Sequence, residues 1–341
     1  MAPRRGGGSA GGYSSDSCPG AFSDLFERVY LAMVVLFLVV YIGISIAQCC
    51  VHKRSGAGKK LTGAPYMLSL ALMILAYGFG LVYSVGDECG ALDYQYTTTF
   101  ALMIADDILY YLGNWGLLFV VFYTLNTMLR ERLGLTMVFK IMPLVILGIL
   151  FAIQFGFLGL HFYNNGELLY GSSGEYFLEE VDKLGLANSV LFLVAVVASG
   201  ALSMMSVFAM RSRGLPGGVC CSPHASMLIL SSLTAYQGLV RWVVILYVTL
   251  LIRAIIGLVS YVVSNLTWKT SIALVYITDL CLALSFVFLL CIAKHVSWSK
   301  TTTVTPGQFY TPGTQQQTTY DYNTNGQYYQ YQQTSPYPHY P

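Results

Sequence analysis

The chain has 341 residues, of which 55% are hydrophobic and 10% are charged, and its mean hydropathy is +0.60. A composition this apolar excludes an ordinary water-soluble domain. The 18 lysines and arginines exceed the 16 acids by only two, so a nucleic-acid binder, which needs a concentrated basic face, is excluded as well.

The N-terminal segment, residues 1–23, is rich in Gly and Ser, which predicts a disordered leader. The first apolar run, Val29 to Ala47, contains no charge. Because about 20 helical residues cross a hydrocarbon core of about 30 Å, this run predicts the first transmembrane helix. A cleaved signal peptide is the alternative, but the run exceeds a typical h-region and Gln48 to Cys50 does not match a small-residue cleavage site.

Further apolar runs of similar length follow along the chain, at residues 64–85, 100–128, 137–162, 187–210 and 271–293. The stretch from Ala225 to Val263 is interrupted by Arg241 and Arg253 and is nearly twice the length of one crossing. It holds either two helices or one helix with a long amphipathic lead-in. With a single crossing there, the sequence predicts an all-α seven-transmembrane helix bundle over residues 24–298.

Basic residues gather on one side of this predicted bundle, which marks that side as cytoplasmic. The opposite side carries a strongly acidic set in two loops. The prediction is therefore an N-terminus outside and a C-terminus inside. The basic residues on the predicted inner side are Lys53, Arg54, Lys59, Lys60, Arg130, Arg132, Lys140, Arg211, Arg213, Lys294 and Lys300.

Modification signals agree with this orientation. Asn265 begins an Asn-Leu-Thr glycosylation sequon in a predicted outer loop. Cys18 and Cys89 both lie on the outer side and are a candidate disulfide, although sequence alone does not fix connectivity. Candidate palmitoylation sites at inner helix ends are Cys49, Cys50, Cys220 and Cys221.

The C-terminal segment, residues 299–341, is dominated after Lys300 by Tyr, Gln, Thr, Pro and Asn. This composition predicts a disordered cytoplasmic tail with adhesive aromatic groups. It acts either as a neutral spacer or as a docking site for a cytoplasmic protein.

Ionisable residues inside the apolar runs are the candidate functional residues, because a charge at membrane depth is costly and normally faces a cavity or a partner. They are Asp106, Asp107, Arg253 and Asp279, at about 10–16 Å below the presumed outer helix ends. Helical spacing places Tyr111, Asn114 and Tyr276 on the same inward faces.

Two interpretations of these charges stay open. One is a structural ion pair of Arg253 with Asp279, or with an acid of the third helix. The other adds a ligand or a translocated group to that pair. Three acids against one arginine leave more negative charge than pairing requires, which favours a ligand site.

Enzymatic chemistry is not predicted, and neither is a metal or a cofactor. The histidines lie at helix ends or in loops, so they cannot form a zinc site within the bundle. Lys269 and Lys294 lie at opposite ends of the last helix, which argues against a retinal Schiff base. An aspartyl-protease dyad of Asp107 and Asp279 would be opposed by the nearby Arg253, which favours ionisation of both acids. The histidines are His52, His161, His224, His295 and His339.

The predicted topology resembles that of G-protein-coupled receptors, but the residues differ. The third helix ends in Leu129-Arg130-Glu131-Arg132, which lacks the acid-Arg-aromatic order of the largest receptor class, and the last helix lacks Asn-Pro-x-x-Tyr. Over the last two helices the chain resembles the fungal lipid-translocating exporter (RTA-like) family and its uncharacterised relatives. Arg253 and Tyr276-Ile277-Thr278-Asp279 fall where that family has an arginine and a Tyr-x-x-Asp element. The acid that follows the arginine in the family is replaced here by Ala254. The resemblance implies transport of lipid or sphingoid substrates.

The functional prediction is a multi-pass protein of the plasma membrane or an endomembrane. It binds a small amphiphile or cation in an outward-facing cleft between the third, sixth and seventh helices, as an exporter or a sensor. The alternative is a receptor-like signalling protein that recruits a cytoplasmic partner through the basic loops at residues 130–134 and 211–218. Membrane lipids are the other expected partner.

Overall fold

The computed structural model describes residues 24–52, 56–89, 96–131, 138–170, 177–212, 225–263, 267–295, 320–322 and 328–330. The chain divides into a helical unit, which ends at residue 302, and a second unit from residue 303 onward, each considered by itself.

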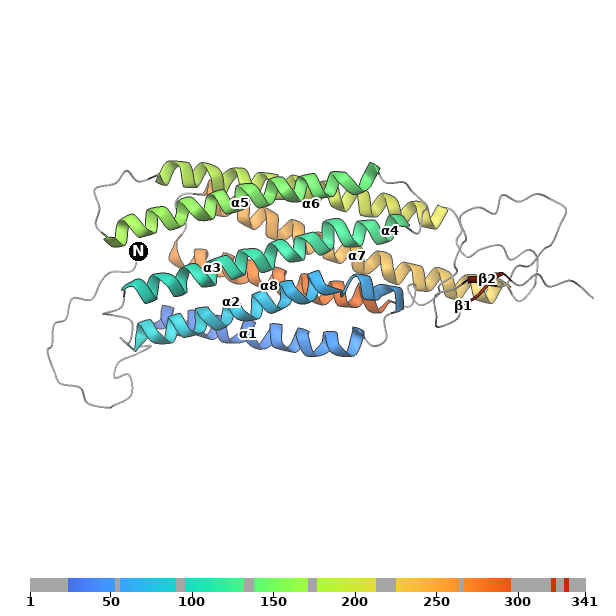
Figure 1. The fold of residues 1–341 in the computed structure, drawn as a ribbon, viewed down its shortest axis with the longest axis horizontal. Coiled ribbons are helices and arrows are strands. Elements are labelled where there is room, and N and C mark those ends of the chain that lie inside the picture. The colour runs from blue at the N-terminus through green and yellow to red at the C-terminus, as the bar shows by residue number, and fades with distance from the viewer. Residues whose placement is uncertain are drawn as a thin grey trace, which may run out of the picture. The chain divides into compact units, whose positions relative to one another are not determined.

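Long helices that run alternately up and down form the first unit (Figure 1). The third crossing is one continuous rod in which an α-helix passes into a π-helical segment, η2, and back into an α-helix. A short 3₁₀ helix, η1, follows the first crossing. The elements are α1 (Leu25–His52), η1 (Gly56–Lys60), α2 (Ala64–Glu88), α3 (Tyr96–Phe119), η2 (Val120–Leu125), α4 (Asn126–Glu131), α5 (Val138–Tyr170), α6 (Leu178–Ser212), α7 (Ala225–Val262) and α8 (Trp268–Lys294).

Seven of the described segments are long and apolar enough to cross a membrane, which confirms the predicted all-α seven-helix fold. The ambiguous stretch from Ala225 to Val263 forms the single helix α7, and the part from Gly238 to Val262 is long and apolar enough for one crossing. The alternative of one helix is therefore the correct one. As a result, α1 begins at one end of the bundle, called here the Leu25 end, and α8 finishes at the other, the Lys294 end (Figure 1).

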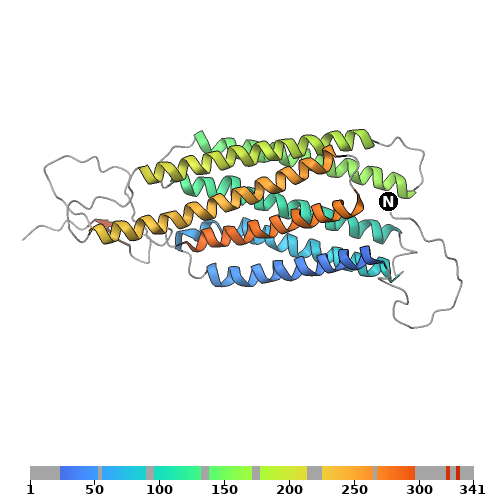
Figure 2. The same cartoon turned by 180° about the vertical axis from the view of Figure 1, so that it is seen from behind.

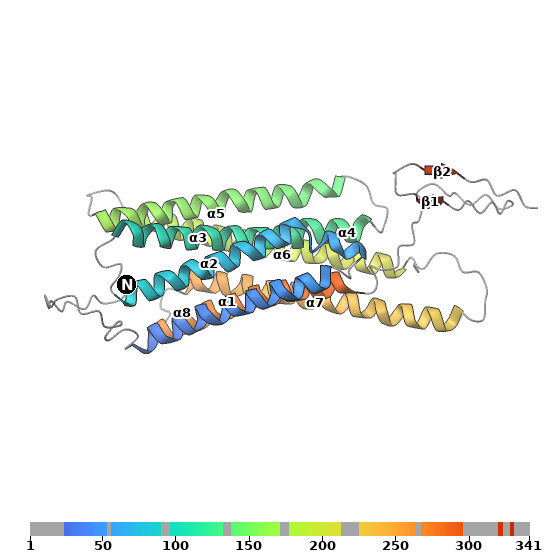
Figure 3. The same cartoon turned by 60° about the horizontal axis from the view of Figure 1, so that its bottom comes forward.

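The crossings form a closed ring. In order around it, each packing on the next, they are α1, α2, the α3–η2–α4 rod, α5, α6, α7 and α8, and α8 returns to α1. Figure 2 shows α8 between α7 and α1, and Figure 3 shows α3 beside α5. Helices that are distant in sequence, such as α1 and α8, therefore contribute side chains to the same interior.

The outer faces of the helices are apolar. Val39, Ile46, Leu68 and Met205 each expose more than half of their surface. Exposed apolar side chains on every side of a bundle suit a lipid surround, because a soluble monomer rarely presents large contiguous apolar patches. The fold is that of a multi-pass membrane protein.

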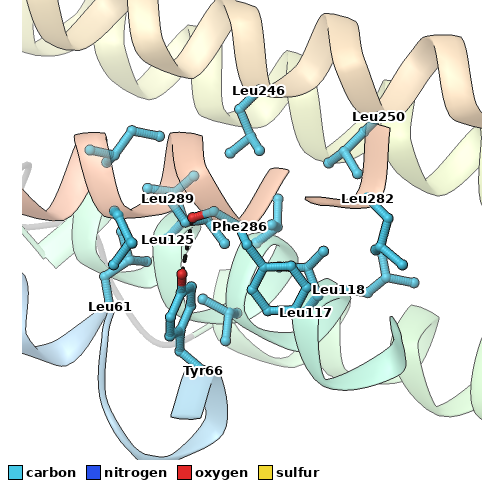
Figure 4. Close-up of a cluster of buried hydrophobic side chains, with 14 of the residues drawn as sticks. Leu61, Tyr66, Leu117, Leu118, Leu125, Leu246, Leu250, Leu282, Phe286 and Leu289 are labelled. Carbon is cyan, nitrogen blue, oxygen red and sulfur yellow. Dashed lines mark hydrogen bonds between the residues drawn. The ribbon is translucent and has the colours of Figure 1, made fainter. Parts of the chain in front are cut away.

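The interior is a layer of large apolar side chains drawn from four crossings (Figure 4). Phe286 of α8 lies at its centre, and the Tyr66 hydroxyl of α2 donates a hydrogen bond of 3.1 Å to the Phe286 carbonyl oxygen. Leu117 and Leu125 come from the third crossing, and Leu246 comes from α7. This layer joins the α8 side of the ring to the α3 side.

Close contact between α2 and α3 depends on two glycines. A Cβ atom on Gly113 would lie 2.7 Å from the Met73 sulfur, and one on Gly116 would lie 2.9 Å from Ser69 Cβ. Small residues allow membrane helices to approach until their backbones nearly touch. The Ser69 hydroxyl uses this proximity to donate to the Gly113 carbonyl oxygen.

In the second unit, β1 (Tyr320–Tyr322) and β2 (Tyr328–Gln330) pair antiparallel, with Asp321 opposite Tyr329. The sequence predicts a disordered tail, whereas the structure has a short ladder at these six residues. The rest of the tail, like the predicted leader at residues 1–23, lies outside the described residues.

Candidate functional site

Arg253 is the one arginine among the predicted intramembrane charges, and it lies on α7 with 7% of its surface exposed. Its Nη1 donates a hydrogen bond of 2.6 Å to Oδ1 of Asn114, which is itself buried on α3. The guanidinium carbon also lies 5.8 Å from the centre of the Phe192 ring on α6, within cation–π range. The guanidinium is therefore held by a neutral amide and an aromatic face.

Asp279, on α8, is 8% exposed and accepts a hydrogen bond of 2.8 Å from the Tyr110 hydroxyl on α3. The sequence favours a direct ion pair between Arg253 and an acid. In the described residues, however, no carboxylate of Asp106, Asp107 or Asp279 lies within the 4.0 Å ion-pair distance of Arg253. Arg253 and Asp279 therefore interact electrostatically without the predicted direct contact, because neutral groups of α3 stand next to both charges.

Asp106 and Asp107 are half-buried neighbours on α3 that face different helices. Asp106 lies against α2, where an added Cβ on Gly80 would be 3.4 Å from its Oδ2. Asp107 interacts electrostatically with His161 of α5. Asp106 is also within electrostatic range of Asp279, so the three acids form one negative region in the half of the bundle toward the Leu25 end.

Aromatic rings surround these acids. Tyr111, one turn from Asp107, packs edge-on against Tyr110 at 5.8 Å and against Phe157 at 6.5 Å. Phe157 stacks on His161 at 6.0 Å and meets Tyr261 of α7 at 6.5 Å. Asp107, which interacts electrostatically with Tyr111 and His161, therefore lies next to an aromatic group drawn from α3, α5 and α7.

The remaining predicted site residues have different surroundings. Tyr276 is half-buried and packs against Phe37 of α1 at 5.5 Å. Asn265 lies outside the described residues, and so do Cys220 and Cys221. Cys49 and Cys50 are free and exposed near the end of α1, as acylation requires. Cys89 carries a disulfide, but its predicted partner Cys18 lies outside the described residues.

A second polar cluster, which the sequence did not indicate, lies toward the Lys294 end. Asn126 donates to Ser199 at 2.9 Å, and the Tyr247 hydroxyl contacts Ser199 at 2.8 Å and Ser203 at 2.9 Å. Ser203 donates to the Asn126 side-chain oxygen at 2.7 Å. Asn126 also donates to the Phe122 carbonyl oxygen at 2.9 Å, so its amide satisfies a backbone acceptor of the π-helical segment η2.

In the described part of the chain, no three His, Cys, Asp or Glu side chains gather where they could hold a metal ion. Comparisons of the chain with protein-family models, curated proteins and solved structures find no match. The geometry described above is therefore the basis for assigning a function.

Proposed function

We propose that this membrane protein binds a small amphiphilic cation at the acids of α3 and α8, and that it acts as an exporter or a sensor of that cation without enzymatic chemistry. The observation that carries the proposal is the excess of carboxylates over cations. Three acids share this region, while the single arginine is hydrogen-bonded to the neutral Asn114. A cationic ligand supplies the missing positive charge.

The aromatic surroundings favour an organic cation. A cation within about 6 Å of an aromatic centroid is attracted by the ring quadrupole, and quaternary ammonium groups are commonly recognised in this way. Tyr111 interacts with Asp107, and Phe157 packs on Tyr111, so the two rings provide aromatic and apolar surface near this acid. The resemblance of the last two helices to lipid-translocating exporters supports the same class of ligand.

The orientation of the site follows from charge. In the described residues the Leu25 end carries the basic residues Arg28, Lys183 and Lys269, whereas the Lys294 end carries twice as many: Lys59, Lys60, Arg130, Lys140, Arg211 and Lys294. Since lysine and arginine mark the cytoplasmic side, the Leu25 end faces outward and the acids are reached from outside. The location is the plasma membrane or an endomembrane.

A binding measurement tests the proposal. Purified protein in lipid nanodiscs is titrated with tetrapropylammonium, and we expect saturable binding that Asp107→Asn weakens at least about tenfold, equivalent to about 1.4 kcal/mol. Glu180→Gln is the matched control, because it removes an exposed acid at the same end of the bundle. Equal binding by wild type and Asp107→Asn would refute the proposed site.

A flux measurement distinguishes an exporter from a sensor. The wild type and a variant neutralised at Asp107, Arg253 and Asp279 are reconstituted in liposomes loaded with labelled tetraethylammonium. An exporter releases the label only when these residues are intact, whereas a sensor binds the ion without releasing it.

A receptor-like role is the second candidate, and the π-helical segment favours it. Single π turns within α-helices often mark functional sites, and η2 joins the acid-bearing half of the third crossing to the buried cluster of Asn126, Ser199, Ser203 and Tyr247. Under this function, a cytoplasmic partner is captured by the wild type and lost when the basic loops at residues 130–134 and 211–218 are neutralised.

A further inference from the structure

Three tyrosine hydroxyls that the proposed function does not use surround Asp279, the α8 acid of the proposed cation-binding region. They come from three helices: Tyr41 from α1, Tyr77 from α2 and Tyr110 from α3. The Tyr41 and Tyr77 rings lie 5.3 Å apart, and the Tyr77 and Tyr110 rings lie 6.4 Å apart. With the carboxylate of α8, four crossings converge on one small volume.

Two of these hydroxyls lack hydrogen bonds. The Tyr77 hydroxyl faces both the Asp279 carboxylate and the Tyr41 hydroxyl, but neither approach reaches hydrogen-bond geometry. Tyr41 is 0% exposed and Tyr77 is 8% exposed, so bulk water does not solvate them. A buried hydroxyl without a partner is unfavourable, and such an atom in a folded protein calls for a specific reason.

Asp279 is under-satisfied as well. An ionised carboxylate offers about four lone-pair positions. Among the described residues, Asp279 accepts one hydrogen bond, from Tyr110, and forms no ion pair. A buried charge requires neutralisation or several strong partners.

We propose that Asp279 and the hydroxyl oxygens of Tyr41 and Tyr77 bind a small monovalent cation, with Na⁺ as the fitting ion. All the ligands are oxygens, which hard cations prefer, and a single carboxylate balances a single positive charge. A water molecule would satisfy the hydroxyls but would bring no positive charge into contact with the carboxylate, which Arg253 reaches only at longer range and without a direct ion pair. The inference rests on the proposed function in sharing Asp279, and it goes beyond that function because it places an inorganic ion at Asp279 and the two tyrosine hydroxyls, while Asp107 holds the organic cation.

Thermal unfolding of the purified full chain tests this site. The melting temperature is measured at constant pH and ionic strength while NaCl replaces N-methylglucamine chloride. We expect a saturable rise with Na⁺ in the wild type and no rise in Asp279→Asn, because a ligand that binds only the folded state stabilises it.

Tyrosine variants provide the sharper measurement, because they retain the charge. Tyr41→Phe should weaken the apparent Na⁺ affinity by at least about fivefold, since one coordinating oxygen is lost. Tyr66→Phe is the matched control. It removes an equally buried hydroxyl, which is bonded to the Phe286 carbonyl, and it should lower the melting temperature while leaving the Na⁺ response unchanged.

Three results would overturn the site: a wild type with no Na⁺ response, a response retained in Asp279→Asn, or a Tyr41→Phe response equal to that of the wild type. The last would also reassign the Tyr41 hydroxyl as a merely unsatisfied group. Tetrapropylammonium binding is scored separately on Asp107→Asn, so failure of the Na⁺ site and failure of the organic-cation site are distinguishable.

Discussion

The contact between Arg253 and Asn114 gives the most quantitative prediction about the buried charges. Asn114→Leu retains most of the side-chain volume but removes the oxygen that lies 2.6 Å from the guanidinium. Arg253→Leu removes the donor and leaves the Asn114 amide without its charged partner. Each single variant should be destabilised, and the double variant should lose less stability than the sum of the two.

The size of this coupling can be worked out from the contact. A hydrogen bond to a charged group contributes about 1.5–3 kcal/mol in proteins generally. Hydrogen bonds between membrane helices average about 0.6 kcal/mol and reach about 1.7 kcal/mol. Because this bond is short, charge-assisted and fully buried, we expect a coupling free energy of about 1.5 kcal/mol.

Reversible unfolding in mixed micelles of increasing SDS fraction measures the four free energies of unfolding. Asn114→Leu combined with Tyr66→Phe is the control cycle, since these residues share no partner and should be additive within about 0.5 kcal/mol. A coupling below about 0.5 kcal/mol between Asn114 and Arg253 would refute the argument that the amide holds the guanidinium.

Three further predictions follow from other parts of the molecule. Tyr247→Phe should lower the free energy of unfolding by about 1–2 kcal/mol, because the Tyr247 hydroxyl forms hydrogen bonds with Ser199 and Ser203. Ser206→Ala is the control: it loses only a hydrogen bond within its own helix, so the free energy of unfolding should change by less than about 0.5 kcal/mol. Burial lowers the pKa of His295, so the unfolded chain takes up a proton at a higher pH than the folded chain does. The free energy of unfolding should therefore fall as the pH drops from about 7 to 5.5. His295→Gln should show a smaller fall. Glycosidase treatment should shift the electrophoretic mobility of wild type but not of Asn265→Gln. A tag after Pro341 should bind antibody only in permeabilised cells. Antibody binding to the tag in intact cells would contradict the proposed orientation.

The crossings could be predicted from the sequence because a helix needs about 20 predominantly apolar residues to cross the bilayer, and few other structures need such a long apolar run. The residues at which the helices begin and end were harder to predict. The fifth crossing, α6, begins at Leu178, well before the predicted start at Ala187, because the helix continues into polar sequence. Its first turns carry Glu179 and Glu180, which suit a helix N-terminus, and Lys183 forms an ion pair of 2.7 Å with Glu179 one turn away. Hydropathy does not detect such stabilisation.

At the site, the cost of burying charge identified Arg253 and Asp279, but it did not identify their partners. Which groups meet depends on the rotation of each helix and on the order of the ring, and neither is encoded in one helix alone. Tyr41 and Tyr77 resemble ordinary aromatic residues of apolar runs. The position of Tyr41 well inside an uncharged run, away from the interface that tyrosine prefers, is the signal that would have marked it.

The two polar regions are separated by the apolar layer of Figure 4, and this separation bears on mechanism. Between Asn114 and Asn126 the third crossing rises about 18 Å, and its buried side chains there are Leu117, Leu118, Val120, Val121, Phe122 and Leu125. Along the third crossing, the buried side chains between the two polar regions are therefore all apolar. An exporter has to open this layer, whereas a sensor has only to shift it. In both cases movement at η2 would break the fewest regular backbone hydrogen bonds, because this segment already departs from α-helical hydrogen bonding. In addition, the Asn126 side chain already donates a hydrogen bond to one of the carbonyl groups of this segment.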